Sequence, residues 1–129
     1  MTYMTNTSST GQTGEQVAAN FLKNNGYEIL EMNYKNNLGR RLGEIDIIAE
    51  DKKEDELVFV EVKTREYQKY KDTLPEENIT YPKLRKFARI ASAYLNQKRW
   101  QGRAYRFDAI SVWLDWNSRM AKIKHIRNI

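Results

Sequence analysis

The sequence predicts an α/β domain in which a central sheet is flanked by helices. Three observations support this prediction. Apolar residues recur at helical spacing before Gly26 and again after Thr80, two apolar runs enclose the polar loop 50–56, and further segments are rich in strand-forming residues. The order of elements is therefore helix, three strands, helix, two strands, without an internal repeat. Helices on both faces would bury the apolar side of the sheet, although the order of the strands within it stays open.

The chain has 129 residues, enough for one domain and too few for two. Residues 1–10 are polar and lack the basic and apolar regions of a signal peptide. We expect them to form a disordered tail before a single domain at 11–129. No apolar run approaches the roughly 20 residues that cross a bilayer, so no membrane partner is expected.

The chain has no cysteine and one histidine, His125. These counts exclude disulfides, thiolate zinc sites, cysteine nucleophiles and multi-histidine metal sites. The absence of cysteine also fits a cytoplasmic protein. Any metal must then be bound by carboxylates, which favours Mg²⁺, Mn²⁺ or Ca²⁺ over zinc or copper.

The first helix is predicted from the capping-box spacing of Thr13 to Gln16, with Thr10 as the other candidate cap, and ends at Gly26. Glu15 precedes Ala18, Ala19 and Leu22 at helical spacing, so it points toward the core side; a free surface glutamate is the alternative. A first strand, Tyr27 to Tyr34, and a basic turn over residues 35–42 follow.

A hairpin is predicted next. The apolar runs 43–49 and 57–63 flank a loop too polar to be part of the core. If Glu50 lies opposite Leu57, side-chain alternation places the acidic and basic residues of both strands on one face. In that register Asp46 faces Glu61, and Glu44 faces Lys63. The other face is purely apolar and comprises Ile45, Ile47, Ala49, Val58, Val60 and Val62.

The polar face of this hairpin has two interpretations. It is either a solvated surface with cross-strand ion pairs or a site that binds a divalent cation. Ile48 and Phe59 share the face, which indicates that it is partly covered. Buried carboxylates that face each other repel and take up protons unless a cation lies between them.

The second helix begins near Thr80 or Tyr81, with Pro82 in its first turn, after a polar loop over residues 66–80. Strands are predicted at Tyr105 to Leu114 and Met120 to Ile129, on either side of a turn. The apolar stripe of the helix comprises Leu84, Phe87, Ala88, Ala91, Tyr94 and Leu95.

The net charge is +5, and no acidic residue occurs from Asn78 through Phe107. A basic region of this kind indicates a polyanionic partner, although a solvated basic helix is an equal alternative. Its basic residues are Lys83, Arg85, Lys86, Arg89, Lys98, Arg99, Arg103 and Arg106. Asp108 is expected to pair with a neighbouring arginine, and His125 to be a packed or surface residue.

Asp46 followed by Glu61-Val62-Lys63 on adjacent strands resembles the PD-(D/E)xK nuclease superfamily, although Ile45 replaces the proline. The resemblance implies the restriction-endonuclease-like αβββαβ core, a mixed sheet flanked by helices, here with an extra C-terminal strand. A larger set of motifs resembles those of the small bacterial YraN-like family, whose members are classed as endonucleases. These motifs are Gly14-Glu15, Gly26-Tyr27, Ile29-Leu30, Asn33, residues 43–46 and 59–65, Tyr94-Leu95, residues 106–108 and His125-Ile126.

The resemblance implies a metal-dependent endonuclease that acts on DNA. Branched or junction DNA is one candidate substrate, because the arrangement is similar to that of archaeal Holliday-junction resolvases, and flap, single-stranded and RNA substrates stay open. Glu15, Asp46, Glu61 and Lys63 fall on the catalytic positions. Asp46, Glu61, the Val62 carbonyl and Glu15 would bind Mg²⁺ or Mn²⁺, Lys63 would orient the attacking water, and Glu44 would support the site from outside the ligands. Resolvases of this fold act as dimers, so the resemblance leaves a homodimer as one possible assembly.

Contacts to nucleic-acid phosphates are expected from seven basic residues: Arg40, Arg41, Arg65, Lys83, Arg85, Lys86 and Arg89. The alternative function is a non-catalytic nucleic-acid-binding module that keeps the nuclease fold.

Overall fold

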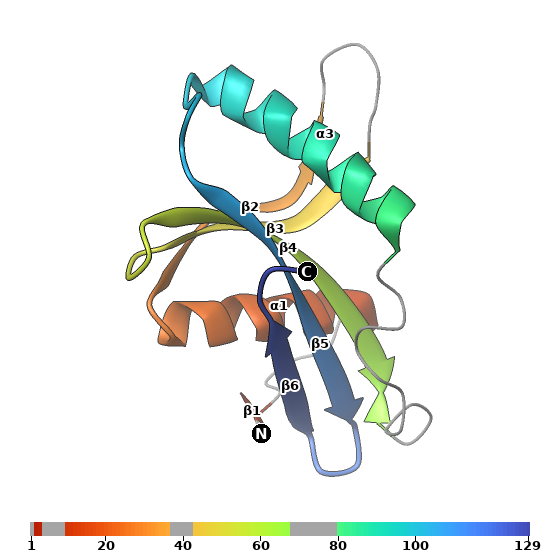
Figure 1. Ribbon diagram of the computed structural model, residues 1–129. Helices are drawn as coiled ribbons and strands as arrows, with labels where there is room; N and C mark the ends of the chain where they lie inside the picture. Colours follow the sequence, from red (N-terminus) through yellow and green to blue (C-terminus); the bar gives the residue numbers. More distant parts are fainter. Residues whose placement is uncertain (1, 4–9, 37–42, 68–79) are drawn as a thin grey trace.

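One sheet organises the computed structural model, which describes residues 2–3, 10–36, 43–67 and 80–129 (Figure 1). Its strands lie in the order β1-β6-β5-β4-β3-β2. Among the described strands only β4 and β5 pair in parallel, so the sheet is mixed. The elements are β1 (Thr2–Tyr3), α1 (Thr10–Asn24), β2 (Tyr27–Lys35), β3 (Glu44–Asp51), β4 (Glu56–Glu66), α3 (Tyr81–Lys98), β5 (Tyr105–Asp115) and β6 (Met120–Ile126).

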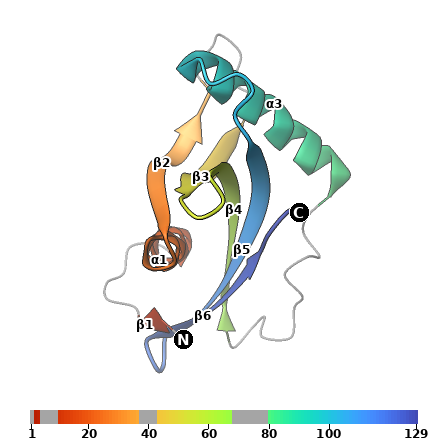
Figure 2. The same ribbon diagram turned by 60° about the vertical axis from the view of Figure 1, so that its left-hand side comes forward.

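This order confirms the predicted α/β fold class, an αβββαβ core with a C-terminal strand. Helices α1 and α3 lie on opposite sides of the sheet (Figure 2). None of the helices in the described ranges is long and apolar enough to cross a membrane.

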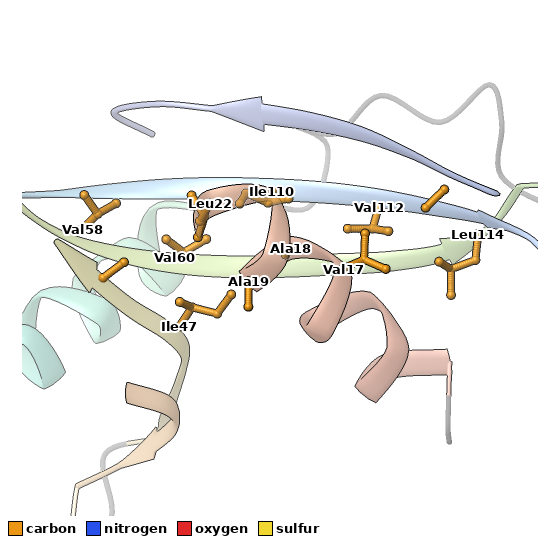
Figure 3. Close-up of a cluster of buried hydrophobic side chains, with 12 residues drawn as sticks. Val17, Ala18, Ala19, Leu22, Ile47, Val58, Val60, Ile110, Val112 and Leu114 are labelled. Carbon is orange, nitrogen blue, oxygen red and sulfur yellow. The ribbon is translucent and has the colours of Figure 1, made fainter. Parts of the chain in front are cut away.

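Helix α1 covers one face because its apolar stripe fits the valines and isoleucines of the central strands (Figure 3). Burial of each such side chain contributes about 1.5–3 kcal/mol to stability. The buried cluster comprises Val17, Ala18, Ala19, Leu22, Ile47, Ala49, Val58, Val60, Ile110, Val112, Leu114 and Ala121.

Helix α3 covers the opposite face. Thr80 is its N-cap and accepts a hydrogen bond from the Lys83 backbone N–H, which confirms the predicted start. Most of the predicted stripe is buried, whereas Leu84 packs at the edge of the cluster and Ile90 joins it. The cluster comprises Ile45, Ile48, Leu57, Phe59, Phe87, Ile90, Ala91, Tyr94 and Leu95.

The predicted hairpin register is confirmed where β3 and β4 pair. Glu50 lies opposite Leu57, and the paired residues extend as far as Ile47 and Val60. The prediction for Ile45 was wrong, because Ile45 packs with Ile48 on the α3 face rather than with Ile47.

The reversal of Ile45 follows from a break in side-chain alternation. On the neighbouring strand, Met32 pairs with Ile47 and Tyr34 with Ile45. Between them Asn33 has a φ of 53°, the left-handed conformation that asparagine tolerates better than most residues. Asn33 therefore lies level with Asp46, and the pairs on either side of it keep one register.

Several boundaries differ from the predictions. Helix α1 begins at Thr10, which the sequence offered as the alternative cap, one turn before the predicted capping box. Thr2–Tyr3, in the expected disordered tail, pairs with β6. Strand β6 ends at Ile126 rather than at the last residue. The predicted basic turn, for residues 37–42, and most of the predicted polar loop, for residues 68–79, lie outside the described residues.

Candidate active site

Asp46 lies where the β3–β4 ladder ends. Its Oδ2 accepts a hydrogen bond from the Val62 backbone N–H at 2.8 Å. Burial, opposed by the hydrogen bond from the Val62 N–H and assisted by the neighbouring carboxyls of Glu15 and Glu61, raises the pKa of Asp46 to about 6. Asp46 is therefore a carboxyl crowded by two others.

Glu15 reaches Asp46 from the first turns of α1, and a hydrogen bond links their side chains. The preceding residue, Gly14, allows this approach. A Cβ atom on Gly14 would lie 1.9 Å from the Oγ1 atom of Thr64 on β4, so a larger residue would push α1 away. The prediction that Glu15 points toward the core side agrees with this placement.

Glu61 projects from β4 toward α3. Its Oε1 atom lies 2.5 Å from the Nζ atom of Lys83 and 3.8 Å from that of Lys63. Its Oε2 atom is buried and has no hydrogen-bond partner among the residues that the structure describes. Two ammonium groups thus bind one oxygen of a carboxylate whose other oxygen is unsatisfied.

Lys63 is half-buried beside Glu61. Burial lowers its pKa, and the neighbouring Lys83 and Arg65 lower it further, whereas Glu61 opposes the shift. The Lys63 ammonium is therefore held near the carboxylates and is poorly solvated.

The donor set suits a hard divalent cation. Within the described ranges, no three acidic or histidine side chains already form a cation-binding group. Asp46 is nonetheless an electrostatic neighbour of both Glu15 and Glu61, and the free Oε2 atom of Glu61 lacks a partner that a cation would provide. Oxygen donors are the ligands that Mg²⁺ and Mn²⁺ accept. The residues present therefore fit such an ion.

Glu44 has a different neighbour from the predicted one. It pairs with Lys35 of β2, and their charged atoms are 3.8 Å apart. The predicted position opposite Lys63 required the β3–β4 ladder to continue past Ile47, where the paired residues end. Glu44 is thus tied to the outer strand.

The basic residues fall into three groups. Arg85, Lys86 and Arg89 are exposed along α3, whereas Lys83 reaches into the carboxylate site. Arg65 is half-buried near Lys63. Arg40 and Arg41 lie outside the described residues.

The positive charge of the acid-free segment is partly neutralised by the β3–β4 hairpin. Arg103 pairs with Glu50, and the buried Arg106 contacts Asp51, Glu56 and Asp108. The cationic surface is therefore narrower than the sequence suggests.

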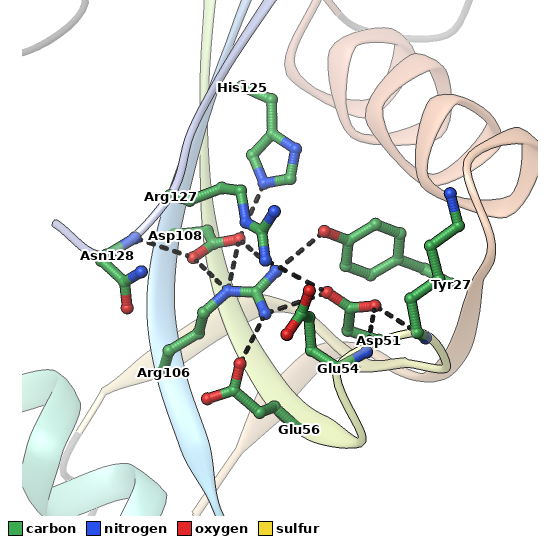
Figure 4. A network of polar contacts seen from close by, with 10 residues as sticks. Tyr27, Asp51, Glu54, Glu56, Arg106, Asp108, His125, Arg127 and Asn128 are labelled. Carbon is green, nitrogen blue, oxygen red and sulfur yellow. Dashed lines mark hydrogen bonds and ion pairs between the residues drawn. The ribbon is translucent and has the colours of Figure 1, made fainter.

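Arg106 is the centre of a polar network at the other end of the sheet (Figure 4). It pairs with Asp108 at 3.0 Å, as predicted, and Asp108 also contacts His125 Nε2 at 2.7 Å. The sequence signal for this network is the alternation of Arg106 and Asp108 in an otherwise apolar strand. The network joins β5, β6 and the β3–β4 turn, which is a structural role.

Comparison with known proteins places the chain in a family. The model of "Uncharacterised protein family UPF0102" matches residues 14–112. A UPF0102 protein of Moorella thermoacetica is 41% identical over 117 residues, covering 91% of each chain. A UPF0102 protein of Clostridioides difficile is 40% identical over 123 residues, which cover 95% of this chain and 97% of the relative. One of Syntrophus aciditrophicus is 44% identical over 111 residues, which cover 86% of this chain and 81% of the relative. The chain therefore belongs to the UPF0102 family.

Proposed function

We propose that this protein is a PD-(D/E)xK nuclease that hydrolyses phosphodiester bonds of DNA with Mg²⁺ or Mn²⁺. The observation that supports this most is the convergence of Asp46 with Glu15 and Glu61, beside the half-buried Lys63. Crowded carboxylates next to an ammonium group are costly for a fold to maintain, and phosphodiester hydrolysis explains all four residues.

The carboxylates would hold the cation. Asp46 and Glu61 are its direct ligands in this proposal, joined by Glu15 and the Val62 carbonyl. A bound divalent ion lowers the pKa of water and polarises a phosphoryl oxygen. The Val62 N–H fixes one oxygen of Asp46, which leaves Oδ1 as the oxygen available to an ion. Partial burial of Asp46 and Glu61 limits competition from solvent.

Lys63 acts on the substrate side of the carboxylates. Its ammonium group orients the attacking water and offsets the negative charge that develops on the phosphate. The packing that half-buries Lys63 keeps this charge in a low-dielectric position, where it is worth more than at an exposed surface.

The exposed basic face of α3 would hold the DNA backbone. Arg85, Lys86 and Arg89 follow Lys83 on the helix that contacts Glu61, so a phosphate chain bound there passes the site. Contacts of this kind give affinity without sequence preference.

A non-catalytic nucleic-acid-binding module is the second candidate. The ion pair between Lys83 and Glu61 favours it, because a lysine already neutralises a proposed metal ligand. In that case the carboxylates and lysines would be a structural charge cluster beneath a DNA-binding helix.

A substrate panel distinguishes the two functions. Junction, flap, duplex, single-stranded DNA and RNA are incubated with the full chain and Mg²⁺ or Mn²⁺. The nuclease proposal predicts cleavage of at least one DNA substrate by the wild type and none by Asp46→Asn. Binding without cleavage in every reaction would leave the binding module as the function.

A further inference from the structure

Lys83 differs from the other basic residues of α3 in its contacts. Its side chain is 28% exposed and reaches Glu61, whereas Arg85, Lys86 and Arg89 are exposed. Lys83 and Lys63 meet at the same oxygen of Glu61. Lys83 is therefore part of the carboxylate site.

The position of Lys83 in its helix makes this contact informative. Lys83 lies in the first turn of α3, which contains no acidic residue. The helix dipole disfavours a cation there, and a negatively charged partner outside the helix offsets this effect. Glu61 supplies the negative charge from β4, and Thr80 caps the turn that holds the lysine backbone in place.

Charge balance shows what a divalent ion would change. In the metal-free site, the two lysines offset two of the three negative charges of Glu61, Asp46 and Glu15. A doubly charged cation at the same carboxylates would leave an excess of positive charge. The ammonium of Lys83 is the group best placed to leave the site. It comes from α3 rather than from the strands that hold the carboxylates, and α3 also carries the proposed DNA-binding surface.

We infer that Lys83 is a displaceable counter-ion of Glu61. It neutralises this carboxylate in the metal-free protein, competes with the divalent cation for it, and moves to a substrate phosphate when the cation binds. This inference rests on the proposed function, since it takes Glu61 as a metal ligand. It assigns Lys83 a role in metal affinity that a simple backbone contact would not have.

Calorimetric titration with Mn²⁺, without nucleic acid, tests the competition. Lys83→Met keeps the length of the side chain and removes its charge, so Mn²⁺ affinity should rise by roughly 5- to 150-fold, the usual range of coupling between competing groups. Lys98→Met removes the same charge at the opposite end of α3 and should leave the affinity unchanged.

A second measurement uses the wild-type chain, so it does not depend on the folding of a variant. Titration with Mg²⁺ should shift the side-chain ammonium resonance of Lys83, assigned from through-bond correlations in the wild-type chain, and leave that of Lys98 in place. Equal Mn²⁺ affinity in wild type and Lys83→Met would overturn the inference while leaving the metal site intact. Absence of binding in both would overturn the metal site and the inference together.

Discussion

The Val62 backbone N–H donates a hydrogen bond to Oδ2 of Asp46 at 2.8 Å, immediately beyond the last paired residues of β3 and β4. A side chain thus replaces a backbone carbonyl as the acceptor at the point where the two strands separate. The bond orients Asp46, but burial and two neighbouring carboxyls outweigh its effect on the pKa. Asp46 is held in place in a position that is unfavourable for its charge.

Asp46→Asn should therefore stabilise the metal-free protein near pH 8. The amide oxygen can still accept the Val62 N–H, and its NH₂ group can donate to Glu15. Since one pKa unit corresponds to about 1.4 kcal/mol, the gain should be at most about 3 kcal/mol. Thermal unfolding in the presence of EDTA measures it.

The pH dependence of this gain has a defined sign. The pKa of Asp46 is raised from 3.8 to about 6 in the folded protein, so the folded state binds this proton more tightly than the unfolded state. The contribution of Asp46 to stability is complete below pH 3.8 and is lost as the pH rises through 6. The advantage of Asp46→Asn should disappear toward pH 4; a difference that does not vary with pH would contradict the burial of this carboxyl.

Mn²⁺ should stabilise the wild type and not Asp46→Ala. An ion that binds only the folded state adds about 2.7 kcal/mol at a concentration 100 times its Kd. Thermal unfolding with and without Mn²⁺ at pH 7.5 shows the effect, and calorimetry gives the affinity. Glu50→Ala removes an acid at the far end of β3 and should respond as the wild type does. Equal stabilisation of Asp46→Ala would place the ion elsewhere.

The hairpin that carries the site could be predicted from the sequence because a polar loop fixes where the two strands close. Glu50 therefore lies opposite Leu57, as expected. The surroundings of Asp46 could not be predicted in the same way, because strand patterns assume constant alternation and the chain breaks it at Asn33 and Asp46.

Contacts between separate elements were harder to predict. The helical stripe gives the buried face of α3, but not the point where the helix crosses β4. The ion pair between Lys83 and Glu61 therefore appears only in the structure. For α1 the sequence does hold a signal, since Gly14 beside Glu15 marks a close approach whose partner, Thr64, the sequence does not identify.

Lys63→Ala should reduce cleavage by roughly 10²–10³-fold, the usual cost of removing one group that stabilises transition-state charge. The side chain lies outside the two apolar clusters, so folding should be preserved. Single-turnover cleavage and fluorescence anisotropy separate catalysis from binding. Lys52→Ala, on the exposed β3–β4 turn, is the control. Cleavage by Lys63→Ala at the rate of the wild type would refute the nuclease proposal.

Reversal of Arg85, Lys86 and Arg89 to glutamate should weaken DNA binding and flatten its salt dependence. The slope of log affinity against log salt should fall by roughly 0.9 for each DNA phosphate that the variant no longer neutralises. Anisotropy titrations over a range of salt concentrations give the slope. Reversal of Lys23, Lys122 and Lys124, exposed on α1 and β6, changes the net charge by the same amount and should leave the slope closer to wild type. An unchanged slope in the α3 variant would exclude this face as the DNA-binding surface.

Arg106→Met should destabilise the protein by about 3–5 kcal/mol, because it leaves buried carboxylates without their guanidinium partner. Asp108 is 0% exposed and Asp51 4%, and both contact Arg106. Arg103→Met is the matched control. Its ion pairs, with Glu50 and the exposed Asp55, lie nearer the surface, so the loss should be about 0–1 kcal/mol. Urea denaturation at pH 7 measures both variants.

Low pH should reduce the difference in the free energy of unfolding between the wild type and Arg106→Met. Burial raises the pKa of Asp108, but hydrogen bonds from His125, Arg106 and the Asn128 N–H outweigh it and hold the pKa below the usual range. A lowered folded pKa gives stability above the unfolded value of 3.8, and this stability is lost as the pH falls through the folded pKa. The wild type should therefore lose more stability than the variant below pH 4. This dependence is opposite in sign to that of Asp46, so the two ends of the sheet can be distinguished by titration alone.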